Sequence, residues 1–137
     1  MSPEPEPGAP ERLASTTYGE HGPRLVLLHG LFGQGRNFTG VAKALAEDAR
    51  VTLLDLPDHG RSPWSSTFSY VAMADQVADH LSVTAPGERW TVAGHSMGGK
   101  VAMLVALRHP ALVERLCVVD VAPVPTSAVS SLSLIHI

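Results

Sequence analysis

The sequence predicts an α/β fold in which a mostly parallel sheet carries helices on both faces. Two observations lead to this fold class. Several apolar runs, such as Arg24–His29 (RLVLLH), are continuous rather than alternating, which is typical of strands buried on both sides in a parallel sheet. Between these runs lie segments whose apolar residues recur at spacings of three or four, as in amphipathic helices. Strands that alternate with helices form βαβ units, whose functional residues gather beyond the carboxyl ends of the strands.

We expect one edge strand followed by buried strands. The edge strand is the short stretch Leu13–Gly19, ahead of the turn at His21–Pro23. The buried strands are apolar runs bounded by turn residues, namely Arg24–His29, Arg50–Leu56, Trp90–Ala93 and Leu112–Ala122. No internal repeat is visible in the sequence.

Helices are expected in the intervals between the strands. Asn37 can cap a helix that runs to about Asp48, and Ser69 can cap a second helix. The apolar face of the first helix would comprise Phe38, Val41, Leu45 and Ala49, and that of the second Tyr70, Met73, Val77 and Leu81. A third helix follows Gly98, with Val101, Leu104, Val105 and Arg108 at helical spacing, and Pro110 ends it.

The composition is that of an ordinary globular domain. The 137 residues are 45% hydrophobic and 17% charged, enough for one domain with a core. The formal net charge of −3 and the absence of a Lys/Arg cluster argue against a nucleic-acid partner. No apolar run has the length of a membrane span, and no secretory signal is visible, so we expect a cytoplasmic protein with no membrane partner. The single cysteine, Cys117, is expected to be a small buried residue.

The two ends of the chain are expected to lie outside the domain. Residues 1–12 are rich in Pro and Glu and should be disordered, which leaves residues 13–125 as the domain. Residues 126–131 are low in complexity, and residues 132–137 read LSLIHI. One frame of a transposase end sequence used in sequencing libraries (CTG TCT CTT ATA CAC ATC) encodes this hexapeptide. We therefore interpret 132–137 as adapter read-through and exclude it from fold reasoning.

The most informative stretch is the turn that joins the Trp90 strand to the third helix. It reads Gly94-His95-Ser96-Met97-Gly98, a G-x-S-x-G pattern between a strand and a helix. The turn is tight, so side chains at Gly94 or Gly98 would collide with neighbouring backbone. The Ser96 hydroxyl would then stand clear of the strand edge, close to the first amides of the helix.

The same stretch permits a second interpretation. Gly94 to Lys100 also fits seven positions of a phosphate-binding P-loop, G-x-x-x-x-G-K. The eighth position should be Ser or Thr to hold magnesium, and here it is Val101. In this nucleotide-binding alternative Asp120 would be the magnesium-holding carboxylate.

Three ordered motifs together resemble a known family. HGLFG (29–33), DLPDHGRS (55–62) and GHSMGG (94–99) look like the N-terminal half of the α/β-hydrolase fold. VVDVAPV (118–124) is similar to a subgroup of small bacterial and mitochondrial serine esterases within that family. The resemblance covers residues 13–125, and family chains are about twice as long as this one. It implies a domain truncated before the last strands and the lid.

The resemblance also implies roles for individual residues. Ser96 would be the nucleophile, and the oxyanion hole would comprise the backbone amides of Met97 and Leu31. Phe32 and His95 would line the substrate pocket. Asp120 matches the acid of the esterase subgroup, but a helix-capping or loop carboxylate is an equally good interpretation. The residues expected to shape the loops and turns of the motifs are His29, Gly30, Asp55, His59, Gly60, Ser62, Gly94 and Gly98.

The implied function is hydrolysis by a serine esterase or thioesterase. A small-molecule ester or thioester would acylate Ser96, and water would release the acyl group without a metal or an organic cofactor. A histidine base is expected late in the chain, where only His136 occurs, inside the suspected adapter tail. The chain is therefore expected to be inactive by itself. Two further alternatives stay open. The first is another reaction on the same fold, such as C–C bond hydrolysis, and the second is a truncated binding module without catalytic activity.

Overall fold

The computed structural model describes residues 13–30, 35–56, 69–119 and 132–136. Its strands form one sheet in the order β1-β3-β2-β4-β5-β6. Their bounds are Ser15–Tyr18 (β1), Arg24–Leu28 (β2), Arg50–Leu54 (β3), Trp90–His95 (β4), Val113–Val119 (β5) and Leu132–His136 (β6). The four central strands run parallel, and β1 and β6 pair antiparallel at the edges. The predicted mostly parallel α/β sheet is thus confirmed.

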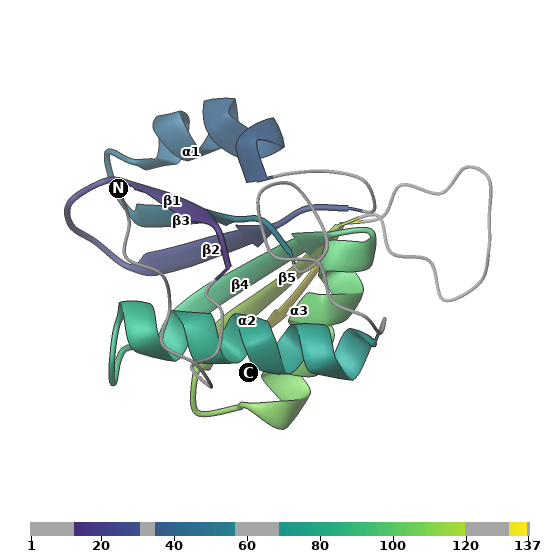
Figure 1. Cartoon of the computed structure of the whole chain (residues 1–137). Coiled ribbons are helices and arrows are strands. Elements are labelled where there is room, and N and C mark those ends of the chain that lie inside the picture. Colours follow the sequence, from purple (N-terminus) through teal and green to yellow (C-terminus); the bar gives the residue numbers. More distant parts are fainter. Residues whose placement is uncertain (1–12, 31–34, 57–68, 120–131, 137) are drawn as a thin grey trace, which may run out of the picture.

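Helices cover both faces of the sheet, as the sequence predicts (Figure 1). The short helix α1 (Thr39–Leu45) lies on one face, and α2 (Tyr70–Thr84) and α3 (Met97–Arg108) lie side by side on the other. The main core lies between the sheet and this helix pair, and its largest fully buried side chains include Trp90, Leu28, Leu54 and Leu81. Burying a side chain of this size contributes roughly 1.5–3 kcal/mol each, so this layer supplies most of the hydrophobic stabilisation.

The helix α2 begins where its capping residue predicts. The Ser69 hydroxyl accepts a hydrogen bond from the Ala72 amide at 3.2 Å, which satisfies one of the free amides of the first turn. Met73, Val77 and Leu81 are buried against the sheet, as their spacing indicates. The local pattern therefore determined both the start and the buried face of this helix.

The expectation for the first helix is wrong in its start and in its buried face. Asn37 does not cap it, because Asn37 lies inside a 3-10 turn, Gly35–Phe38, and the α-helix begins only at Thr39. Val41 is 51% exposed and Leu45 is 41% exposed, whereas Ala42 is fully buried. The short helix approaches the sheet through this alanine, which allows its backbone to lie close to β3.

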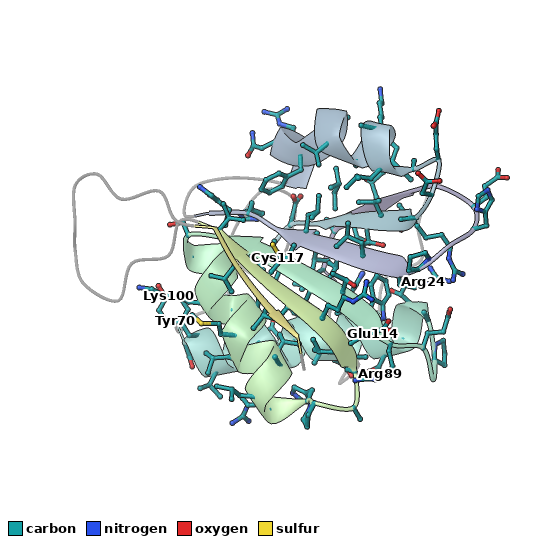
Figure 2. All side chains as sticks on the ribbon, turned by 180° about the vertical axis from the view of Figure 1, so that it is seen from behind. Arg24, Tyr70, Arg89, Lys100, Glu114 and Cys117 are labelled. Atoms are coloured by element: carbon teal, nitrogen blue, oxygen red, sulfur yellow. The ribbon has the colours of Figure 1, made fainter. Side chains whose placement is uncertain are left out.

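The sheet face that carries α1 is only partly covered by the described residues. Its core is a small cluster around Leu27, Ala42, Val51 and Leu53, on β2, β3 and α1. Cys117, on β5, is only partly buried rather than fully buried as the sequence predicts, because α1 lies over β2 and β3 rather than over β5 (Figure 2).

The end of the chain differs from the expectation that it lies outside the domain. Leu132–His136 pairs with Val119–Arg115 as an antiparallel strand at the edge of the sheet. The pairing has a physical basis, since an edge strand offers unpaired backbone groups to any extended segment of high β-propensity. In the ranges that the structure describes, no helix is long and apolar enough to cross a membrane.

An ion-pair cluster joins α2 to α3 on the outer surface. Arg108 donates two hydrogen bonds to the Asp75 carboxylate, each of 2.9 Å, and His109 Nε2 lies 2.8 Å from Asp75 Oδ1. The hydrogen bonds from Arg108 and then from His109 lower the pKa of Asp75 from its ordinary 3.8 to about 2. The same pairing raises the pKa of Arg108.

We expect Asp75→Asn to lower the stability modestly at neutral pH and to remove part of its acid dependence. The folded-state pKa is depressed, so the contribution of Asp75 is present above pH 4 and is lost as the pH falls from about 4 to about 2. Urea unfolding of both proteins between pH 2 and pH 7 measures this difference. The two stability curves should converge at the acid end, and a constant offset across the whole range would contradict the assignment.

Candidate active site

The residues that the motifs single out meet at the carboxyl edge of the sheet. In the register of the parallel strands, Leu28 lies opposite Gly94, and Gly94 lies opposite Val118. The segment after β2 and the turn after β4 therefore emerge side by side. A Cβ placed on Gly30 would lie 3.4 Å from the Ser96 Cβ and 3.3 Å from His95 Nδ1. The structure thus brings the first motif into direct contact with the serine turn.

Ser96 has an unusual backbone conformation, with φ 55° and ψ −116°. Residues other than glycine rarely adopt a positive φ, and the resulting backbone strain costs about 1–3 kcal/mol. The surrounding backbone holds the residue in place, since the Ser96 amide donates to the Val119 carbonyl at 3.0 Å and the Ser96 carbonyl accepts from the Gly99 amide at 2.9 Å. This geometry is that of the strained elbow expected for the G-x-S-x-G pattern, with a half-buried serine at the tip.

The two glycines of the elbow are required by close backbone contact. A Cβ on Gly94 would collide with the Gly98 carbonyl, and a Cβ on Gly98 would collide with the carbonyls of Leu28 and His29. Every obstacle is backbone, which cannot move aside as a flexible side chain can. The steric reason that the sequence suggests for Gly94 and Gly98 is therefore present in the structure.

Met97 is the first residue of α3, and its side chain is buried. The amides of the first helical turn have no acceptor within the helix, and they carry the positive end of the helix dipole. The Met97 amide adjoins Ser96 in the chain, so an oxyanion that forms on a substrate bound to Ser96 would lie within its reach.

His29 connects two of the motifs. Its Nε2 accepts a hydrogen bond of 2.9 Å from the Leu56 amide, and its Nδ1 lies 2.7 Å from the Gly30 carbonyl. Because the amide can only donate, Nε2 carries no proton, and Nδ1 must be the protonated donor of a neutral ring. With 1% of its surface exposed, His29 fixes the start of the HGLFG segment to the end of β3, next to the buried Asp55.

A small apolar cavity of about 100 Å³ lies beside the elbow. Its lining residues come from the ends of β2, β4 and β5 and from the turn before α1, and they are Leu27, Leu28, Phe38, Ala93, Gly94, His95 and Val119. His95, which the family resemblance suggests as a pocket residue, is among the residues that line this cavity. Phe38, which the sequence suggested only as a helix-face residue, also lines this cavity.

Several expected site residues lie outside the described ranges. They are the oxyanion-hole residue Leu31, the pocket residue Phe32, the loop residues His59, Gly60 and Ser62, and the acid Asp120. The remaining expected residues are brought together at the edge of the sheet, namely His29, Gly30, Asp55, Gly94, His95, Ser96, Met97 and Gly98.

Two histidines in the described part of the chain have partners elsewhere. His80 is buried, and its Nε2 lies 3.1 Å from the Ser15 hydroxyl, while His109 belongs to the Asp75 cluster. The position of His80 shows that a helix residue can be drawn inward when a polar partner on a neighbouring strand faces it.

A comparison with family models identifies the fold. A model described as "alpha/beta hydrolase fold" matches residues 23–133, which include the parallel strands β2 to β5 and the serine elbow. The chain belongs to the α/β-hydrolase family. The nucleotide-binding alternative thereby loses its support, and Val101, the position that should hold magnesium, is fully buried in the core.

Individual relatives of this α/β-hydrolase are esterases and lipases. The chain is 49% identical over 110 residues to the sn-1-specific diacylglycerol lipase ABHD11 of Xenopus laevis, a match that covers 77% of the chain and 34% of the relative. It is 35% identical over 112 residues to esterase YbfF of Escherichia coli K12, covering 81% of the chain and 44% of the relative. The resemblance to an esterase subgroup is confirmed.

A solved structure supports the same placement. A marine microorganism esterase superposes with a TM-score of 0.80 and 36% sequence identity, over 87% of the chain and 46% of that structure. Across these three matches the α/β-hydrolase chain spans between about a third and a half of the relatives' own length.

Lys100, which the sequence suggests only as the last position of the P-loop alternative, also lies at this edge of the sheet. It is exposed on the first turn of α3, four residues after Ser96, and its amide donates to the Ser96 carbonyl at 3.2 Å. Its ammonium lies 5.8 Å from the centre of the Tyr70 ring, at the start of α2. The signal in the sequence was the spacing, because residues four apart lie on the same face of a helix.

Proposed function

We propose that the whole protein is a serine hydrolase that cleaves small esters or thioesters through an acyl-enzyme on Ser96. The observation that carries the proposal is the strained elbow, which holds Ser96 at positive φ beside the start of α3 and against Gly30. Strained conformations of this kind persist only where the surrounding structure enforces them, and they cluster at functional sites. The esterase and lipase relatives support the same reaction class.

In the proposed reaction the Ser96 hydroxyl oxygen attacks the carbonyl carbon of the substrate. The negative charge that develops on the carbonyl oxygen would be stabilised by the amides of Met97 and Leu31. A histidine takes the proton of the serine and returns it to the departing alcohol or thiol, and Asp120 orients that histidine. Water then cleaves the acyl-serine bond and releases the acid.

We propose that the general base of this mechanism is a histidine of the longer protein, since three described histidines have other partners. His29 is held by Leu56 and Gly30, His80 by Ser15, and His109 by Asp75. We therefore propose that the 137-residue chain alone is inactive and that the longer protein contributes the histidine. A missing triad member leaves only a residual acceleration of about 10³–10⁴ over water.

We propose that the cavity beside the elbow, which adjoins Ser96 through Gly94 and His95, holds a small part of the substrate. Its volume of about 100 Å³ is well below the roughly 300–1,000 Å³ of sites that enclose drug-sized ligands. Its lining is almost wholly apolar, so it suits an uncharged hydrocarbon part of the substrate.

The test is a rapid-mixing experiment with p-nitrophenyl acetate and butyrate on the full-length protein. A burst of one equivalent of p-nitrophenol, together with an acyl mass increase on the peptide that contains Ser96, is the expected result. The 137-residue chain serves as the comparison and should show no burst. Turnover without acylation of Ser96 would refute the mechanism.

A further inference from the structure

The charged side chains are arranged differently at the two ends of the sheet. At the amino edge, Arg24 and Arg50 both pair with Glu88, at 3.2 and 3.1 Å, and on the outer surface Arg108 pairs with Asp75. These cations are neutralised by carboxylates. Figure 2 shows Lys100 and Tyr70 together at the opposite end of the molecule from Arg24, where α2 and α3 begin.

Lys100 has an aromatic partner in place of a carboxylate. Within the described part of the chain it forms no ion pair, and its ammonium is held over the Tyr70 ring. A cation–π contact at an exposed site restrains the side chain but leaves its positive charge intact. Asp55, an acidic residue at the same edge, is buried beneath the surface. The rim, meaning the edge of the sheet that carries Ser96, therefore presents the positive charge of Lys100 at a fixed position. Among the described residues, no carboxylate pairs with it.

The position of Lys100 relative to Ser96 is fixed by the helix. The backbone hydrogen bond from Lys100 to Ser96 places them one turn apart, and helical side chains lean toward the N-terminal end. The ammonium thus extends toward the edge that carries Ser96, where the positive end of the α3 dipole adds to its field. An anionic group on a molecule bound at Ser96 would be attracted to this rim.

We propose that Lys100, positioned by Tyr70, binds an anionic group at the far end of the substrate's acyl chain. The substrate class is an ester or thioester whose acyl part ends in a carboxylate or a phosphate group. This inference rests on the proposed function and narrows it. Lys100 is a specificity-determining residue here and takes no part in the bond-breaking steps.

The kinetic test compares two substrates of similar size on the full-length protein, p-nitrophenyl hydrogen glutarate and p-nitrophenyl pentanoate. Lys100→Gln should lower kcat/KM for the glutarate ester about fivefold, the effect of one charge pair near the surface, and leave the pentanoate ester unchanged. Lys100→Arg should restore the preference. Lys43→Gln, which removes an exposed lysine from α1, is the matched control and should change neither substrate. Equal losses on both esters would overturn the proposal.

A binding test separates this proposal from the hydrolase proposal. In the Ser96→Ala protein, NMR titration with monomethyl succinate, dimethyl succinate and methyl 3-phosphonopropanoate needs no turnover. We expect the two anionic ligands to bind more tightly than the neutral dimethyl succinate. Both the Lys100→Gln substitution and 0.5 M NaCl should abolish this difference in affinity. A difference in affinity between the carboxylate and the phosphonate ligand identifies which anionic group the natural substrate carries. If the neutral diester binds as tightly as the anions, the Lys100 proposal is wrong whatever the activity.

Discussion

Replacing Ser96 by alanine in the full-length protein should abolish ester hydrolysis, with a loss in kcat on the order of 10⁶. The expected loss is this large because the proposed acyl-enzyme has no other attachment point. Ser82→Ala, which removes an exposed hydroxyl from α2, is the control and should retain full activity. Steady-state rates with p-nitrophenyl butyrate measure both variants. If Ser96→Ala kept more than about one-hundredth of the rate, the serine mechanism would be refuted.

A companion variant, Ser96→Gly, separates the chemical role of the serine from its conformational cost. Glycine adopts φ 55° without penalty, so this variant should relieve part of the roughly 1–3 kcal/mol of strain while losing activity as completely as Ser96→Ala. We expect its melting temperature to exceed that of Ser96→Ala by several degrees. Equal melting temperatures would show that the elbow is not strained.

The second large effect is expected from Gly98→Ala. The new Cβ would collide with the carbonyls of Leu28 and His29, so β2 and α3 must separate at the point where the elbow is held. Overpacking against rigid backbone costs about 3 kcal/mol, at the upper end of measured values, and displacing Ser96 should reduce activity together with stability. Denaturant unfolding and the p-nitrophenyl ester assay measure the two effects.

Gly40→Ala is the matched control for this substitution. Gly40 lies in α1, and a Cβ there meets no atom within 4 Å, so the same chemical change has no steric cost. Alanine is the better helix former by roughly 0.5–1 kcal/mol, and Gly40→Ala should therefore stabilise the protein slightly. If both variants had similar stabilities, the close approach of Gly98 to β2 would not be the reason for the glycine.

The pattern of apolar and capping residues correctly predicted those strands and helices whose position depends mainly on residues close together in the sequence. Continuous apolar runs identified β2 to β5, and the cap at Ser69 located the start of α2. The same reasoning failed for α1, where Val41 and Leu45 fit a helical apolar stripe but face outward. A seven-residue helix makes few contacts, so its rotation about its axis depends on which residue lets it approach the sheet, and that residue is Ala42.

The sequence alone determined the fold class, the serine at a strand-to-helix turn and the need for glycine at positions 94 and 98. These are properties of short segments, in which the spacing of residues and the space available to a backbone turn leave few alternatives. Tertiary structure alone decided which motifs meet. The parallel register places Gly30 against Ser96, the His29 ring joins β2 to the end of β3, and the packing of α2 beside α3 brings Tyr70 to Lys100. Such contacts join residues from 27 to 66 positions apart in the chain. No local pattern encodes them, because they depend on how strands and helices are arranged in space.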